Sequence, residues 1–200
     1  MAYSDFTFRQ LLKEYGLHYK LQSLNLSSAA NLIVPSEYLL KDLQEAKMMP
    51  IYSEKAKSEL IITPVLKELR RHCDYDFTIF SGYGLDLGGE LSGICDYIIA
   101  KIPNAIEVEA PIICMVESKN KSPEEGYAQC AAEMYAAKIF NEREGKTMPY
   151  IYGCVTNAFD WIFMRLEDDT FYIDQKRYNL EDTSKLLGVM YYIVKQFKAY

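Results

Sequence analysis

An acidic and a basic residue close the apolar run "PIICMVESK", in which Glu117 and Lys119 stand two positions apart. Side chains alternate between the two faces of a strand, so both are expected on one face, together with Ile113 and Met115. Both faces of this run stay apolar until its end, which is typical of a strand covered on both sides. Charged groups at the end of such a strand are costly unless something pairs with them or uses them.

A second carboxylate stands in the preceding apolar run, "LSGICDYIIAK", where alternation sets Asp96 on the face of Ile94 and Ile98. If the two strands pair as neighbours, Asp96 meets Glu117 and Lys119 at one place. Two carboxylates and a backbone carbonyl form a hard oxygen site suited to Mg²⁺ or Mn²⁺. Such a cation polarises a phosphate or activates a water, and the lysine positions that water or stabilises the developing charge.

The complete pattern, D-(x)n-E-x-K on two strands followed by a helix with a glutamine, resembles the PD-(D/E)xK restriction-endonuclease-like nuclease superfamily. The resemblance covers roughly residues 54–165 and is carried by "SGICDY", "VESK" and "GYAQCAAEM". The longer stretch that ends in "YGCVTN" and "WIF" is similar to bacterial, particularly cyanobacterial, members. The family's proline before the aspartate is Cys95 here, although only the carboxylate is chemically essential.

This resemblance implies a Mg²⁺-dependent (or Mn²⁺-dependent) nuclease that hydrolyses phosphodiester bonds in DNA or another nucleic acid. The metal ligands that it implies are Asp96, Glu117 and, from the preceding helix, Glu59, with the Ser118 carbonyl assisting. It also makes Lys119 the catalytic lysine and has Gln129 orient water or substrate.

Each of these residues also has a plain alternative. Glu117 and Lys119 could form a surface ion pair, which contributes about 0–1 kcal/mol, and Asp96 could be a turn residue at a strand edge. Glu59 has charged neighbours and could face solvent, and Gln129 could be a surface residue among small alanines. The chain as a whole could be a catalytically inactive nuclease-like module that serves binding or assembly.

The order of the predicted elements indicates one α/β domain with a mixed central sheet flanked by helices. Residues 1–50 are expected as an N-terminal helical extension, 53–175 as the nuclease-like core and 181–200 as a C-terminal helix. A helix is predicted over 53–71, with Glu59, Ile62 and Leu66 on one stripe and a kink or restart at Pro64. The strands are predicted at 77–87, 91–102, 111–118, 149–157, 161–168 and 170–173, with a helix over 123–144.

Composition bounds the partners and the compartment. The net charge is −6 and the pI is near 5.1, which argues against a broadly basic nucleic-acid-binding surface. The best local basic patch combines Arg70 and Arg71 with Lys119 and Lys121. Apolar runs fall short of the ~18 residues of a membrane span, and five well-spaced cysteines suit reduced thiols, so we expect a cytoplasmic protein without a secretion signal or membrane contact.

The C-terminal helix has a long apolar stripe. Its members could form a homodimer interface or pack into the core, and they are Leu186, Leu187, Met190, Tyr191, Val194 and Phe197. The sequence leaves both readings open.

Overall fold

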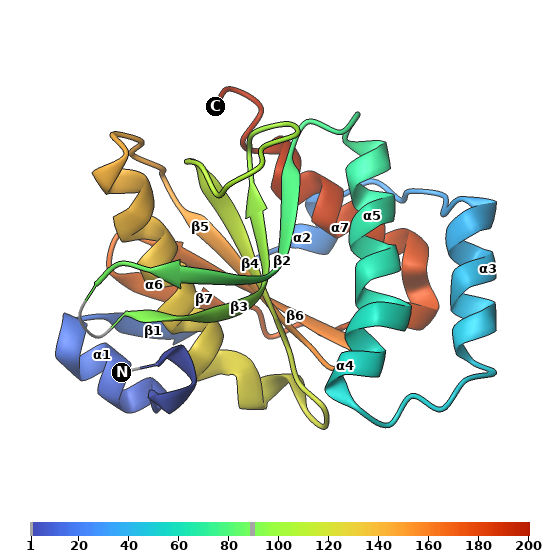
Figure 1. Ribbon diagram of the computed structural model, residues 1–200, viewed down its shortest axis with the longest axis horizontal. Coiled ribbons are helices and arrows are strands. Elements are labelled where there is room, and N and C mark those ends of the chain that lie inside the picture. The colour runs from blue at the N-terminus through green and yellow to red at the C-terminus, as the bar shows by residue number, and fades with distance from the viewer. Residues whose placement is uncertain (1, 89–90) are drawn as a thin grey trace.

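One mixed β-sheet runs through the structure, a computed structural model that describes residues 2–88 and 91–200 (Figure 1). Its strand order is β1-β7-β6-β5-β4-β3-β2, and β8 pairs with β6 beside this path. The strands are β1 (His18–Leu21), β2 (Thr78–Asp86), β3 (Ser92–Ala100), β4 (Ile112–Ser118), β5 (Ile151–Thr156), β6 (Asp160–Glu167), β7 (Thr170–Ile173) and β8 (Tyr178–Asn179).

The central pair, β4 and β5, is parallel. On one side of it β2, β3 and β4 form antiparallel pairs, and on the other side β5, β6 and β7 do so. Strand β1 then adds to β7 in a parallel pairing. A parallel pair needs a long crossover, and here the connection between β4 and β5 contains the longest helix described.

Helices cover both faces of the sheet (Figure 1). The α-helices are α1 (Phe8–Tyr15), α2 (Leu26–Ala29), α3 (Glu37–Ala46), α4 (Glu54–Lys57), α5 (Thr63–His72), α6 (Tyr127–Arg143) and α7 (Thr183–Lys195). Three 3₁₀ turns are described, η1 (Tyr3–Asp5), η3 (Pro123–Gly126) and η4 (Leu180–Asp182), and η2 (Ser58–Ile62) is a π-helical turn.

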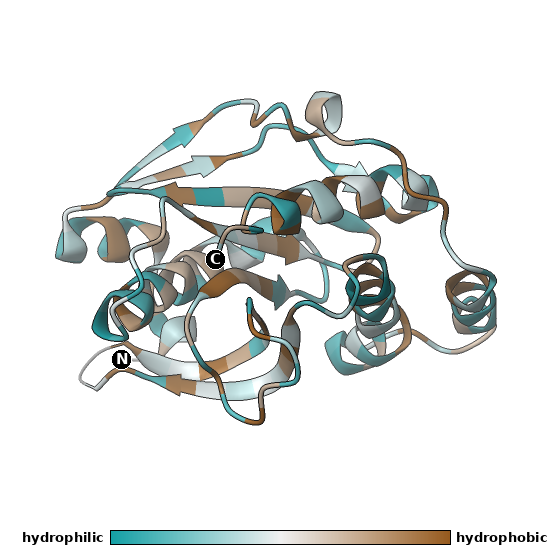
Figure 2. Ribbon diagram, turned by 90° about the horizontal axis from the view of Figure 1, so that it is seen from above, coloured by the Kyte–Doolittle hydropathy of each residue, from teal (hydrophilic) through white to brown (hydrophobic). Residues whose placement is uncertain are grey.

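Two hydrophobic clusters lie on the two sides of the sheet. One packs α1 and α6 against it, and the other packs α3, α5 and α7. Hydrophobic colouring follows the central strands in Figure 2, and every residue of β4 is buried. The predicted α/β class with a mixed sheet between helices is thus confirmed, and the six predicted strands appear within a few residues of their expected bounds.

The first fifty residues differ from the helical extension that the sequence predicts. They contain the edge strand β1 in addition to α1, α2 and α3, and they contribute to both faces of the sheet. The segment between α2 and α3 crosses over α7, where the carbonyl oxygen of Asn31 would lie 2.0 Å from a Cβ on Gly188. Ile33 also donates its backbone N–H to the Ser184 carbonyl, at 3.0 Å.

The helix predicted over 53–71 is interrupted by the π turn η2. In this turn the Thr63 N–H donates to the carbonyl of Ser58, five residues earlier. The next residue, Pro64, has no N–H to donate. The extra residue rotates the helical phase by about 100°. The predicted stripe therefore breaks, with Ile62 buried and Glu59 exposed.

Strand β4 holds a second departure from simple periodicity. The pairing with β3 passes from Ile99↔Cys114 to Ala100↔Ile112, which leaves Ile113 as the extra residue of a bulge. Ile113 therefore packs in the cluster with α5 and α7, whereas Met115 packs under α6. The prediction that Ile113 shares a face with Met115 is wrong for this reason.

The apolar stripe of the C-terminal helix belongs to the core. Leu186, Leu187, Val194 and the following Phe197 are at most 1% exposed. Of the two readings that the sequence left open, the structure supports core packing, and this stripe is not available as a dimer interface. All five cysteines are free and buried.

Candidate active site

The pairing of β3 with β4 brings the first two predicted residues together. Tyr97 pairs with Val116 in the antiparallel register, so the next position outward sets Asp96 beside Glu117. The backbone N–H of Ser118 donates to Asp96 Oδ2 at 2.8 Å. Two carboxyl groups thus meet where β4 ends.

Lys119 lies in the same place. Its backbone N–H donates to the Thr156 carbonyl of β5 at 2.8 Å, which fixes the chain just beyond β4. Its ammonium donates to Glu117 Oε1 at 2.5 Å and to Gln129 Oε1, on α6, at 3.0 Å. The structure therefore gathers four of the five side chains predicted for the site, which are Asp96, Glu117, Lys119 and Gln129.

Glu133, which was not predicted from the sequence, extends this hydrogen-bond network into the core. Gln129 Nε2 donates to Glu133 Oε1 at 3.1 Å, one turn further along α6. The side chain of Glu133 is 0% exposed and that of Glu117 is 1% exposed. The i, i+4 spacing of Gln129 and Glu133 on a helix of small residues was the available signal.

The two buried carboxyl groups have strongly perturbed proton affinities. Burial raises the pKa of Glu117 to about 7; the charge of Asp96 adds to the rise and Lys119 opposes it. Burial and the charge of Glu117 raise the pKa of Glu133 well above its ordinary value. Glu117 Oε2 and Glu133 Oε2 lack a hydrogen-bond partner among the described atoms. A proton on Glu133 that is donated to Glu117 satisfies both oxygens.

Exchanging Glu133 for glutamine is expected to reduce the fall in stability that sets in as the pH rises above about 5. Raised pKa values in the folded state mean that the stabilisation is full below the unfolded pKa and is lost as the pH rises through the folded values. Glutamine mimics the protonated carboxyl and does not titrate. Urea unfolding of both proteins across this range should show a gap that widens with pH, by at most about 1.4 kcal/mol per unit. Parallel curves would contradict the shared proton.

The pKa values of the other two charged groups of the site, Asp96 and Lys119, are also shifted. Burial raises the pKa of Asp96, and the Ser118 amide and the charge of Lys119 oppose that rise. Burial lowers the pKa of Lys119, but the charge of Glu117 and its hydrogen bond more than reverse the effect, so the pKa is raised overall. Lys119 is therefore an ammonium ion at neutral pH.

The structure does not bring Glu59, the predicted ligand from the preceding helix, to this cluster. Its side chain is 63% exposed, and its Oε1 lies 3.9 Å from Lys55 Nζ. Glu54, five residues earlier, lies nearer: burial raises its pKa, the charge of Lys119 lowers it and the charge of Asp96 raises it. The extra residue of the π turn moves Glu59 off the face of Ile62 and brings Glu54 toward it, so a stripe drawn through a regular helix selects the wrong glutamate.

The donor set suits a hard divalent cation. Asp96 and Glu117 supply carboxylate oxygens side by side where β4 ends. Within residues 2–88 and 91–200, no group of three Asp, Glu, His or Cys side chains is arranged to hold a metal ion. Mg²⁺ needs no such cage, because it keeps several waters and is commonly held by one or two carboxylates. The residues fit Mg²⁺ or Mn²⁺ on this ground.

The predicted basic patch is divided in the structure. Arg71 pairs with the buried Glu68 at 2.8 Å, and Arg70 Nε donates to the Phe77 carbonyl at 2.7 Å. Both arginines thus hold the C-terminal end of α5 in place. Near the site, Lys121 is exposed, and the buried Lys57 donates to the Asn120 carbonyl.

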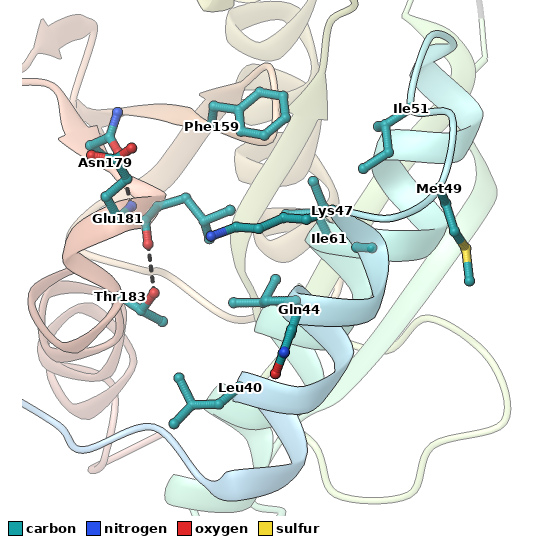
Figure 3. A pocket seen from close by; sticks show the side chains of 13 residues that line it. Leu40, Gln44, Lys47, Met49, Ile51, Ile61, Phe159, Asn179, Glu181 and Thr183 are labelled. Atoms are coloured by element: carbon teal, nitrogen blue, oxygen red, sulfur yellow. Dashed lines mark hydrogen bonds between the residues drawn. The ribbon is translucent and has the colours of Figure 1, made fainter.

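A separate cavity of about 730 Å³ opens between α3, η2 and η4 (Figure 3). Its walls are mostly apolar, from side chains such as Leu40, Ile61 and Phe159, and the side chain of Lys47 extends along it. None of the four clustered site residues lines it in the described part of the chain. The carboxylate cluster and this cavity are therefore different places on the molecule.

Comparisons with protein-family models, with curated proteins and with solved structures found no match. No described helix is long and apolar enough to cross a membrane. Any inference about function therefore depends on the arrangement of the side chains.

Proposed function

We propose that this protein is a divalent-cation-dependent phosphodiesterase that acts on nucleic acid, with a restriction-endonuclease-like core of the PD-(D/E)xK type. The observation that carries the proposal is the meeting of Asp96, Glu117 and Lys119 at one end of the β3–β4 pair.

In this mechanism Asp96 and Glu117 would hold Mg²⁺ or Mn²⁺, which would supply Lewis acidity and lower the pKa of a bound water. Lys119 acts as a hydrogen-bond donor, because its raised pKa keeps it charged at neutral pH. It stabilises negative charge as it develops on the phosphoryl oxygens. Gln129 Oε1 accepts a second hydrogen bond from this ammonium and helps to hold it in place.

A catalytically inactive binding or assembly module is the second candidate. The net charge of −6 favours it, as does the internal use of Arg70 and Arg71, because both reduce attraction for a polyanion. The intact set of Asp96, Glu117 and Lys119 favours the enzyme, since a module without catalysis has no need to bury these charges.

Calorimetric titration with Mn²⁺ tests the proposal directly. The parent protein should bind the cation, and Asp96→Asn should abolish the binding signal because the amide carries no negative charge. Asp42→Asn, on the exposed face of α3, is the matched control and should bind as the parent does. In Mn²⁺, the parent and Asp42→Asn should cleave single- or double-stranded DNA or RNA, and Asp96→Asn should not. A folded parent protein that neither binds Mn²⁺ nor cleaves would overturn the proposal in favour of the binding module.

A further inference from the structure

We propose that Glu133 is a positioning residue, which sets the orientation of the Gln129 side-chain amide and through it the direction of the Lys119 ammonium. The catalytic meaning of this inference rests on the proposed function, whereas the positioning itself is a property of the folded chain. Three consecutive contacts carry it: Glu133 Oε1 with Gln129 Nε2, Gln129 Oε1 with Lys119 Nζ, and Lys119 Nζ with Glu117 Oε1.

The first step is the asymmetry of the amide. A glutamine side chain presents an acceptor oxygen and a donor nitrogen at nearly equivalent positions, and an ammonium group can donate only to the oxygen. A flipped Gln129 would put its NH₂ against Lys119 and its oxygen against Glu133 Oε1. Glu133, as the acceptor 3.1 Å from Nε2, therefore stabilises the same orientation that the ammonium requires, in which the oxygen faces Lys119.

The second step is the position of Glu133 itself. It is 0% exposed, and most of the other buried residues of α6 are small or apolar. These other buried residues are Cys130, Ala131, Ala132, Met134, Ala136, Ala137 and Asn141. A buried carboxyl is less favourable than a well-packed apolar side chain of similar volume. The hydrogen bond to Gln129 gives this position a use that an apolar residue could not fulfil.

The third step concerns the donors of Lys119. An ammonium group has three N–H donors, and Glu117 Oε1 and Gln129 Oε1 accept two of them. With two acceptors in fixed places, the direction of the third N–H is determined. That donor is the one left for a water or a phosphoryl oxygen, so the orientation of Gln129 decides where the ammonium can act.

The experiment compares Glu133→Leu, which fills the space but cannot accept, with Glu133→Gln, which retains an acceptor oxygen. Glu142→Leu, at an exposed position of the same helix, is the control. The side-chain amide of Gln129 is observed by NMR in protein labelled with ¹⁵N-glutamine. Acylation of Lys119 by a neutral reagent is followed by peptide mass spectrometry, and cleavage is assayed in Mn²⁺.

In Glu133→Leu the Gln129 amide protons should move to the positions of a free amide. Acylation of Lys119 should become roughly tenfold faster, the factor that corresponds to one hydrogen bond to a charged group. Glu133→Gln should restore both signals, and Glu142→Leu should resemble the parent. Cleavage should fall in the leucine variant and recover in the glutamine variant.

The inference is overturned if folded Glu133→Leu keeps the parent's amide shifts and lysine reactivity, or if Glu133→Gln behaves like the leucine variant. If the leucine variant does not fold, Glu133→Met, with a flexible apolar side chain, takes its place under the same criteria. A parent protein without cleavage would count against the proposed function alone, because the amide and lysine measurements require no substrate.

Discussion

Replacing Lys119 with methionine is expected to reduce Mn²⁺-dependent cleavage at least about a hundredfold, the usual scale for a donor that stabilises transition-state charge. The methionine fills the space of the lysine stem but brings no donor to the phosphoryl group. It also removes the cation that opposes the rise in the pKa of Glu117, so this carboxyl takes up a proton more readily at neutral pH. Cleavage rates measured under single-turnover conditions, at neutral pH and near pH 8.5, separate the two effects.

The loss of the donor should persist at the higher pH, whereas the loss that arises from protonation of Glu117 should recover there. Lys121→Met is the matched control, because Lys121 is exposed and lies two residues further along the chain. Calorimetry near pH 8.5 should show that Lys119→Met still binds Mn²⁺. Cleavage at the parental rate in this variant would remove the role assigned to the lysine.

The elements that the sequence predicts best are those whose own pattern determines them. The runs at 77–87, 91–102 and 111–118 are bounded by Gly, Pro or charge, and they form β2, β3 and β4. Strand β1 has no such pattern, because all four of its residues are exposed. Its extended form depends on pairing with β7 along the sheet edge, and a partner distant in sequence leaves no local signal.

Two predictions of which face a residue lies on are wrong, and in each case the cause is an irregularity of the backbone. The π turn at Ser58–Ile62 shifts the helical phase, and a stripe drawn through a regular helix then selects Glu59 instead of Glu54. The bulge at Ile113 similarly shifts the alternation of β4. Each irregularity inserts one residue into a regular period, and period-based reasoning assumes that no residue is inserted.

Within the site, the sequence identified the charged residues and missed the one that is wholly buried. Asp96, Glu117 and Lys119 interrupt apolar runs, so their types draw attention. Glu133 sits in a helix with charged residues at other positions, and its i, i+4 spacing from Gln129 is the one local sign that the two share a face. Only the packing of α6 on β4 reveals that this carboxyl is fully enclosed.

Asn141→Leu is expected to lower the free energy of unfolding by about 3 kcal/mol, through the loss of two buried hydrogen bonds. Asn141 Oδ1 accepts from Ile112 N–H and its Nδ2 donates to Ile112 C=O, both at 2.7 Å. Ile112 adjoins the bulge, and the described pairing of β4 with β5 begins only at Cys114. Asn141 thus replaces the missing strand partner, and leucine would leave both backbone groups unsatisfied. Urea unfolding at neutral pH measures the loss.

Glu142→Leu, at the next position and exposed, should change the unfolding free energy by less than about 0.5 kcal/mol. A similarly small effect for Asn141→Leu would show that water or a backbone shift satisfies Ile112.

The two contacts of α6 with β4 also link stability to the site, because Asn141 holds the start of the strand and Gln129 joins Lys119 just beyond its end. Loss of the Asn141–Ile112 contact lets β4 move relative to α6. The distance of 3.0 Å between Lys119 Nζ and Gln129 Oε1 should then vary more. We therefore expect folded Asn141→Leu to show faster Lys119 acylation than the parent, and Glu142→Leu to leave it unchanged.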